Sequence, residues 1–213
     1  PPAIVSMFLG DELTDIITAI ENGTNYIDKG KSEMEIGVRV LPKFFKDTTD
    51  RNRTSPFAFT GNKFEFRMLG STFSIAGPNI VLNTIVAEEL RQFADTLEKS
   101  NNFDEDLNTL IKNTIRDHKR IIFNGNNYSD DWIEEAEKRG LLNLKTTPDA
   151  LPYFIHSKNI ELFTKHHVFS ESELYSRYEI LMENYCKTIH IEALTMIDMV
   201  KKYIIPSVLS YQG

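Results

Sequence analysis

The sequence predicts an α+β protein that is predominantly helical, with a small β-hairpin or antiparallel sheet piece followed by a helical bundle. Two short runs of alternating apolar and polar residues flank Gly61-Asn62, which indicates a hairpin. From Pro78 onward, apolar residues recur at helical spacing almost to the end of the chain. We therefore expect a mixed α/β piece over residues 1–100 and an all-helical region over residues 101–213, with a soft boundary near residue 100.

The segment before the hairpin contains three predicted elements. Apolar residues near one face predict a helix over residues 3–21, which Asn22-Gly23 ends. Residues 35–41 alternate between apolar and polar, which predicts a strand that Pro42 closes. Residues 46–54 are polar and rich in turn formers, so we expect an exposed loop.

The hairpin has a register that its own sequence predicts. A two-residue turn at Gly61-Asn62 places directly opposed residues on the same side of the sheet. The resulting pairs are Thr60–Lys63, Phe59–Phe64, Ala58–Glu65 and Phe57–Phe66. All four phenylalanines then share one face, which we expect to be core, and the charged residues share the other. A slip by one residue would bury the charges, so the register should be strongly fixed.

The remainder of the chain predicts a series of helices. The expected ranges are 78–99, 104–122, 130–139, Pro148 to about His166, and a long helix ending near Ile204. Gly125-Asn126-Asn127 breaks the second of these, and Ser129 is the expected N-cap of the third. The run Ser170-Glu171-Ser172-Glu173 has the pattern of a capping box and opens the long helix.

Composition excludes several classes of function. A net charge of -7 and a pI near 5.3 argue against a nucleic-acid partner, because phosphate binding needs a basic surface. Cys186 is the only cysteine, which rules out an internal disulfide and fits a reducing cytoplasm; we expect it to be a small core residue. The chain contains neither an apolar run of roughly 20 residues nor a signal-peptide pattern. We expect a soluble, cytoplasmic protein without a membrane partner.

We interpret the paired histidines as structural. His166-His167 lies at a predicted helix end, where a favourable interaction with the helix dipole is expected.

The chain opens on Pro1-Pro2 without an initiator methionine. We therefore expect both ends to be cuts within a longer parent protein.

The charged face of the hairpin is the strongest candidate for chemistry. Lys63, Glu65 and Arg67 alternate along one strand, about 6.6–7 Å apart from one to the next. A carboxylate between two cations can hold a hard divalent metal ion while the cations engage phosphate or carboxylate oxygens. The alternative is a solvent-facing strand whose charges serve solubility. Arg51 and Arg53 precede the hairpin and suggest closure around an anion, although surface loops often carry such pairs without function.

The segment from Asn52-Arg53-Thr54 through Glu65-Phe66-Arg67 closely resembles the late catalytic segment of type III glutamine synthetases. Pro78-Asn79 followed by a helix resembles the next element of that family, and Pro1-Pro2-Ala3-Ile4 resembles the residues after the family's Glu-Ala-Pro flap. The resemblance is specific over residues 50–90 and more diffuse over the helical remainder. It implies that residues 1–100 form the C-terminal part of the catalytic domain and residues 101–213 a helical C-terminal region.

The resemblance also implies a reaction and a set of roles. The reaction is ATP-dependent amide formation from glutamate and ammonia through γ-glutamyl phosphate. Glu65 matches a ligand of a divalent ion (Mg²⁺ or Mn²⁺), and Arg67 matches the arginine that binds the side-chain carboxylate of glutamate. Arg53 matches the residue that steadies the phosphoryl group, and Lys63 stands where many relatives have an arginine near the nucleotide. Ala58 replaces a further nucleotide-contacting arginine of other types.

The expected site is incomplete in this chain. Family members add several glutamates and a histidine from earlier sequence, and one carboxylate cannot hold a divalent ion tightly. We therefore expect an enzymatic parent that is a homo-oligomer, and an isolated chain that is inactive. The long amphipathic helices after residue 100 favour a rival hypothesis, a non-catalytic helical oligomerisation or regulatory interaction module. A small-molecule binder unrelated to nucleotide chemistry is a third hypothesis.

Overall fold

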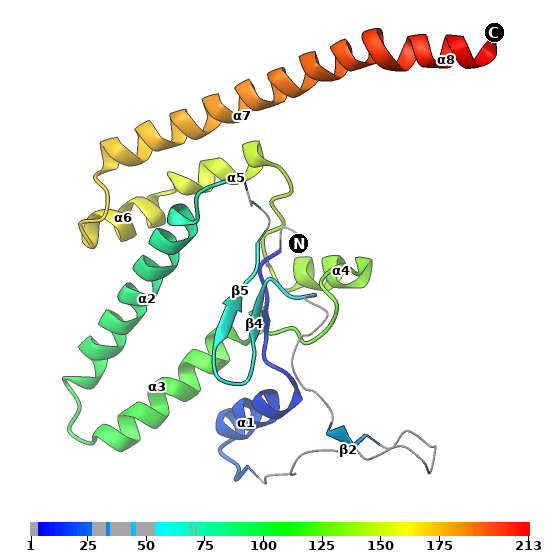
Figure 1. The fold of residues 1–213 in the computed structure, drawn as a ribbon. Helices are drawn as coiled ribbons and strands as arrows, with labels where there is room; N and C mark the ends of the chain where they lie inside the picture. The colour runs from blue at the N-terminus through cyan, green and yellow to red at the C-terminus, as the bar shows by residue number, and fades with distance from the viewer. Residues whose placement is uncertain (1–3, 27–32, 35–43, 46–53, 69, 71) are drawn as a thin grey trace. The chain divides into compact units, whose positions relative to one another are not determined.

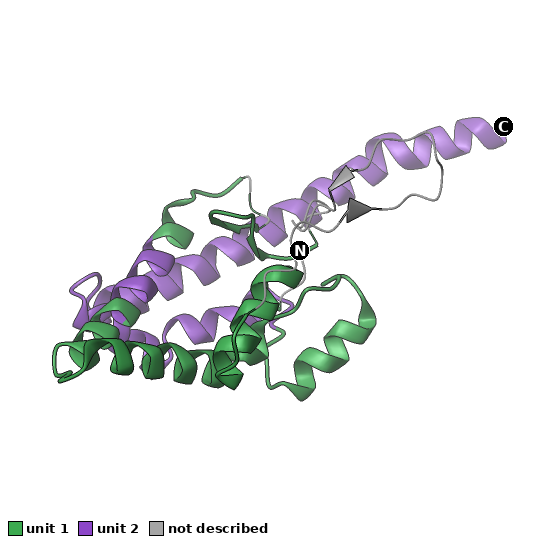
Figure 2. Ribbon diagram, turned by 90° about the horizontal axis from the view of Figure 1, so that it is seen from below, with its two compact units in different colours: residues 1–79, 89–143 green, residues 80–88, 144–213 purple. Residues whose placement is uncertain are grey.

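The computed structural model describes residues 4–26, 33–34, 44–45, 54–68, 70 and 72–213. Figure 1 labels the helices and strands along the chain, and Figure 2 colours the two compact units into which the chain divides. Unit 1 comprises Pro1–Asn79 and Glu89–Asn143, and unit 2 comprises Ile80–Glu88 and Leu144–Gly213. Short strands and many helices confirm the predicted α+β, predominantly helical class. The assignment of residues 1–100 and 101–213 to two regions stays a prediction.

Unit 1 contains a three-stranded sheet in the order β1-β4-β5. β1 (Met7–Phe8) runs parallel to β4 (Phe57–Phe59), which pairs antiparallel with β5 (Phe64–Phe66). A parallel bridge joins Met7 to Ile122, so a later segment extends the sheet beside β1. The sheet is therefore mixed, and the expected antiparallel piece is only its β4-β5 part. A separate antiparallel pair joins β2 (Glu33–Met34) and β3 (Phe44–Phe45). The strand predicted over residues 35–41 and the loop predicted over residues 46–54 lie outside the described residues, apart from Thr54.

The helix predicted over residues 3–21 is wrong in its first part. Residues 4–10 are not helical and include β1, and helix α1 runs only over Asp11–Asn22. Gly10 precedes the helix with φ +80°, a backbone angle that favours glycine, and Gly23 ends it in the left-handed conformation as predicted. The β1 residues pair with β4 and with Ile122, and these distant partners override the local helical periodicity.

The other helices of unit 1 follow the sequence pattern more closely. α2 (Ala76–Leu97) confirms the helix predicted over residues 78–99. α3 (Phe103–His118) ends before the predicted residue 122, because a 3₁₀ turn at Lys119–Ile121 leads into the bridge with β1. Ser129 directly precedes α4 (Asp130–Lys138) as predicted, but its hydroxyl donates to the Asn126 carbonyl at 2.9 Å instead of capping the helix.

The core of unit 1 gathers around the single tryptophan. Ile4, Trp132 and Ala136 are buried, and Phe123, Ile133 and Leu141 pack against them. The Phe123 and Trp132 rings stack with centroids 3.8 Å apart. The N-terminal segment, the strand-like residues after α3 and helix α4 therefore share one core.

Unit 2 contains the helices that follow residue 144 and the middle of α2. The single helix predicted from Pro148 to about His166 is wrong: α5 (Thr147–Phe154) and α6 (Ser157–Lys165) are separate. His156 has an extended backbone, and its Nδ1 accepts a hydrogen bond from the Lys158 N–H at 3.3 Å, which caps α6 and explains the break.

The long final helix begins as predicted and continues further. The Ser170 hydroxyl accepts from the Glu173 N–H at 3.3 Å, and the Glu173 carboxylate accepts from the Ser170 N–H at 2.8 Å, so the capping box at the start of α7 (Glu171–Met199) is confirmed. A π-helical turn over Val200–Ile204 leads into α8 (Ile205–Gln212), so the helix does not end near Ile204. Cys186 is exposed on α7, which corrects its expected core position.

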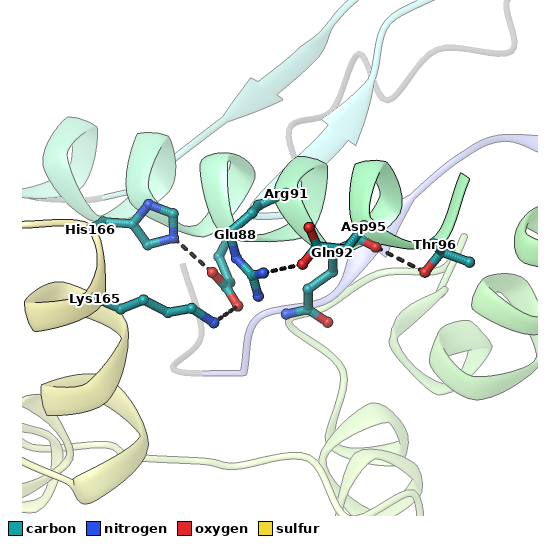
Figure 3. A network of polar contacts seen from close by, with 7 residues as sticks. All are labelled: Glu88, Arg91, Gln92, Asp95, Thr96, Lys165 and His166. Atoms are coloured by element: carbon teal, nitrogen blue, oxygen red, sulfur yellow. Dashed lines mark hydrogen bonds and ion pairs between the residues drawn. The ribbon is translucent and has the colours of Figure 1, made fainter. Parts of the chain in front are cut away.

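A charged contact within unit 2 joins α2 to the end of α6. Glu88 lies 2.9 Å from the Lys165 ammonium and 2.7 Å from His166 Nε2 (Figure 3). His166 is the C-cap of α6, as the predicted helix end requires, and it also has this carboxylate partner from α2. Arg91 and Asp95 form an ion pair one turn apart further along α2.

Candidate functional site

The β4-β5 hairpin has the register that its sequence predicts. Phe57 pairs with Phe66, Ala58 with Glu65, and Phe59 with Phe64. The Thr60 N–H donates to the Lys63 carbonyl at 2.8 Å, which closes the turn. Gly61 has φ +92°, a conformation that L side chains rarely adopt, so the turn requires glycine at this position.

The charged residues of β5 contact one another on one side of the hairpin. Glu65 Oε2 accepts hydrogen bonds from Arg67 Nη2 at 3.1 Å and from Arg67 Nε at 3.3 Å. Glu65 Oε1 lies 3.5 Å from the Lys63 ammonium. The alternation therefore produces a carboxylate held between two cations, and we call Lys63, Glu65 and Arg67 the charged row.

The charged row keeps its carboxylate ionised. The hydrogen bond from Arg67 is the largest effect on the Glu65 carboxyl and lowers its pKa below the ordinary range; desolvation opposes this, and the nearby Lys63 charge lowers the pKa further. The side chains differ in exposure: 19% for Arg67, 39% for Glu65 and 66% for Lys63. The row is therefore open to a ligand from the Lys63 end and more enclosed at Arg67.

The aromatic face of the hairpin is more exposed than the sequence predicts. The phenylalanine rings do share one face, since Phe57 and Phe64 stack with centroids 5.3 Å apart. However, Phe64 is 46% exposed and Phe66 is 36% exposed, so this face is not the expected core. The core of unit 1 forms around Trp132 instead. On the charged side, Ala58 is fully buried opposite Glu65.

A cavity of ≈ 250 Å³ is lined in part by Gly61 at the tip of the hairpin, and its lining does not include the charged row. Its lining includes Leu9, Leu13 and Ile16 from the N-terminal segment and Phe59 from β4. Because Phe59 belongs to the aromatic face, the cavity borders that face and not the face of Glu65. We do not assign it to the chemistry of the charged row.

The two arginines that precede the hairpin, Arg51 and Arg53, lie outside the described residues. Closure of this pair around an anion stays a prediction. Ser55 and Pro56, which follow directly, are buried and lead into β4. The described ranges contain no cluster of three or more His, Cys, Asp or Glu residues suited to a metal ion, so Glu65 does not belong to a complete metal site among them.

Sequence reasoning missed two residues close to this site. In the sequence, Asn124 and Asn127 belong only to a run that breaks a helix, yet Asn127 is fully buried and bonds to the segment just before β4. A signal was present in the high asparagine content of residues 124–127, because buried asparagine side chains usually satisfy nearby backbone or hydroxyl groups.

Within the described residues, no helix is both long and apolar enough to cross a membrane.

Comparisons with known proteins point to one family. A family model described as the glutamine synthetase C-terminal domain matches residues 106–213, half of the chain, where the resemblance from sequence motifs was most diffuse. A glutamine synthetase of Butyrivibrio fibrisolvens is 47% identical over 221 residues, covering 100% of this chain and 30% of the relative. A type-3 glutamine synthetase of Dictyostelium discoideum is 47% identical over 215 residues, covering 100% of this chain and 29% of the relative.

A glutamine synthetase of Bacteroides fragilis (strain YCH46) is 36% identical over 221 residues, again covering 100% of this chain and 30% of the relative. The chain thus spans about 30% of the length of the curated relatives that it matches. The helical half matches the family model, and the whole chain, hairpin included, aligns with these relatives. The chain belongs to the glutamine synthetase family, and its resemblance to the type III members is confirmed.

Proposed function

We propose that this chain contributes part of the active site of an enzyme that joins ammonia to glutamate, using ATP and passing through γ-glutamyl phosphate. The observation that carries the proposal is the charged row, in which one carboxylate lies between an arginine fork and a lysine on the hairpin. Phosphoryl transfer depends mainly on positioning and on neutralising charge at oxygen atoms. A carboxylate that binds a metal ion, next to cations that bind negatively charged oxygen atoms, suits that chemistry.

Glu65 is the residue that we propose as a ligand of Mg²⁺ or Mn²⁺. Carboxylate oxygens are the donors that these hard cations prefer, and the lowered pKa of Glu65 keeps the donor charged. When bound, such an ion neutralises charge on the transferred phosphoryl group. One carboxylate fits as one ligand of the ion, and the described residues hold no cluster of three or more His, Cys, Asp or Glu that would complete the site, so we propose that further ligands come from the rest of the parent protein. For this reason we propose that the isolated chain is inactive.

The cationic residues have different proposed roles. Arg67 presents a planar fork that suits the side-chain carboxylate of glutamate, and it already engages a carboxylate, that of Glu65, in this geometry. Lys63 is the more exposed cation and serves as a point charge near the ATP phosphates. Arg53, proposed to steady the phosphoryl group, follows from the family resemblance alone because it lies outside the described residues.

A substitution of Glu65 in the full-length protein tests the assignment. Glu65→Ala should lower the rate of glutamine synthesis by a factor of about 10²–10³, the usual loss when a charge-stabilising group is removed. Glu183→Ala is a matched control, because Glu183 is an exposed glutamate on α7 that forms an ion pair with Lys187 one turn away, at 2.7 Å. Near-normal synthesis by Glu65→Ala at saturating Mg²⁺ would refute the metal role.

A second substitution separates the proposed substrate contact from simple charge. Arg67→Lys keeps the positive charge but loses the two-pronged fork. We expect the KM for glutamate to rise at least about tenfold, equivalent to about 1.4 kcal/mol, while the KM for ATP changes little. An unchanged KM for glutamate contradicts the proposed role of Arg67.

A role in assembly is a second candidate function, and an observation in unit 2 favours it. Ile191, Leu194 and Met196 lie on α7 with 62%, 54% and 62% of their surface exposed. A helix with apolar residues on all sides is normally covered. We propose that this part of the helix supports the homo-oligomer of a cytoplasmic parent enzyme. Light scattering of the full-length protein with and without residues 188–213 tests it, and an unchanged mass counts against it.

A further inference from the structure

Asn127 connects three chain segments that are far apart in sequence. Its Oδ1 accepts a hydrogen bond from the Ser6 hydroxyl at 2.6 Å, and its Nδ2 donates to the Ser55 hydroxyl at 3.2 Å. Its backbone N–H donates to the Thr54 carbonyl at 3.2 Å. Asn127, Ser6 and Ser55 are all buried, with exposed fractions of 0%, 1% and 2%. These bonds therefore hold the chain at the entrance to β4 against the N-terminal segment, away from competing water.

Asn124 holds the other end of the same N-terminal strand. Its Oδ1 accepts from the N–H groups of Leu9 and Gly10, each at 3.0 Å, and its Nδ2 donates to the Thr14 hydroxyl at 2.8 Å. The residue before Asn124 also bonds to this strand, since the Phe123 N–H donates to the Met7 carbonyl at 2.9 Å. Residues 122–127 thus fix β1 and its flanking residues from Ser6 to Gly10.

Two strand pairings, β1 with β4 and β4 with β5, link β1 to the charged row. Met7 pairs with Phe57 and Phe8 with Ala58, and Ala58 in turn pairs with Glu65. A shift of residues 54–55 would therefore move Glu65 relative to its surroundings.

From this connection we propose that Asn127 is a positioning residue of the active site, one that acts through Ser55 and β4 and does not touch substrate. The inference rests on the proposed function of the charged row. Asparagine suits the position because its amide accepts from one serine and donates to another, which no aliphatic or ionised acidic side chain can do. Loss of the amide removes the acceptor of the buried Ser6 hydroxyl and the donor to Ser55, and the entrance to β4 then relaxes away from the N-terminal segment.

The test is steady-state kinetics of full-length Asn127→Ala and Ser55→Ala. We expect the KM for glutamate and the Mg²⁺ concentration for half-maximal rate to rise at least about tenfold in Asn127→Ala, because displaced binding groups lose affinity and a loss of about 1.4 kcal/mol corresponds to tenfold. Ser55→Ala removes one of the three bonds and should shift both values in the same direction by a smaller factor. The double variant should have the same KM for glutamate and the same Mg²⁺ dependence as Asn127→Ala, since both substitutions break the same hydrogen bond between residues 127 and 55.

The control separates positioning from simple loss of stability. Ser170→Ala removes the N-cap of α7 in unit 2 and should lower the melting temperature without changing either kinetic constant. A purely structural role of Asn127 would lower the amount of active enzyme, and hence kcat, but would leave both constants unchanged. Unchanged constants in Asn127→Ala, with Glu65→Ala inactive, overturn the positioning role alone, whereas an active Glu65→Ala overturns the proposed function.

Ser55→Ala decides the question if Asn127→Ala does not fold. It removes only one hydroxyl, and Ala fits the space of Ser, so the fold should be kept. A folded Ser55→Ala protein with wild-type KM for glutamate and wild-type Mg²⁺ dependence overturns the proposal.

Discussion

Replacing Trp132 with alanine tests whether unit 1 has the core described above. The indole is 1% exposed, stacks on Phe123 at 3.8 Å and packs with Ile4 and Ala136. The Arg139 guanidinium lies over the ring, 5.3 Å from its centroid. The substitution therefore removes the largest fully buried side chain among the described residues, and with it the stacking partner of Phe123.

The expected loss can be worked out from this environment. Truncation of a buried tryptophan to alanine costs about 3–5 kcal/mol, which includes transfer of the ring and the remaining cavity. The contact with Arg139 adds about 0.5–1 kcal/mol at a partly exposed site. The two contributions together come to about 3.5–6 kcal/mol, so at about 2–4 °C per kcal/mol for a chain of this size the melting temperature should fall by about 7–24 °C.

Trp132→Phe is the matched control. Phenylalanine keeps a ring against Phe123, and it also removes the buried indole N–H, for which the described residues offer no hydrogen-bond partner. An unpaired buried polar group costs about 1–3 kcal/mol, so its removal offsets part of the lost packing. The phenylalanine variant should therefore lie much closer to wild type than the alanine variant.

The assay is urea denaturation of the 213-residue chain followed by far-UV circular dichroism, because both variants lack the single tryptophan that fluorescence would report. A loss below about 1 kcal/mol in Trp132→Ala would show that the ring is not packed in a core and would refute the reasoning. Equal losses of unfolding free energy in Trp132→Ala and Trp132→Phe would refute a stabilising role of the ring stack on Phe123.

Three further predictions concern local features. Ser170→Ala should destabilise α7 by about 1 kcal/mol, because it removes the hydroxyl that caps the Glu173 N–H; denaturation midpoints measure this, and no change contradicts the capping role. His167→Gly should raise stability by about 0.5–1 kcal/mol, since His167 has φ +54° after α6 and glycine adopts that angle without a steric penalty; a loss in calorimetry contradicts this reasoning. The pairing of Glu65 with Arg67 lowers the pKa of Glu65 in the folded state, so its stabilising effect is present above the ordinary glutamate pKa of about 4.3 and is lost as the pH falls through the lower folded value. The stability difference between wild type and Glu65→Gln should therefore shrink on acidification below about pH 4, and a difference independent of pH contradicts the ion pair.

The hairpin could be predicted from sequence because its determinants are local. Gly61-Asn62 specifies the turn, and the alternation of aromatic and charged residues specifies which side chains share a face. The charged row follows from this register, and so does the contact of Glu65 with both cations. The capping box at Ser170 is equally local and was predicted for the same reason.

The fold around the hairpin could not be predicted in the same way. Residues 4–10 have helical periodicity but are not helical, because β4 and Ile122 supply hydrogen-bond partners from distant parts of the chain. The exposure of Phe64 and Phe66 also depends on where unit 1 places its core, and that is decided by Trp132 and Ile4.

By itself the sequence determined the family, the hairpin with its register, and most of the helices, since each of these depends on neighbouring residues or on a continuous motif. Only the tertiary structure decided how the hairpin is held. Asn127 lies in a run that signals a helix break, and its burial against Ser6 and Ser55 exists only after segments 121 and 72 residues away have come together. A hydrogen bond between distant segments has no local signal, because its free energy depends on burial that the whole fold provides.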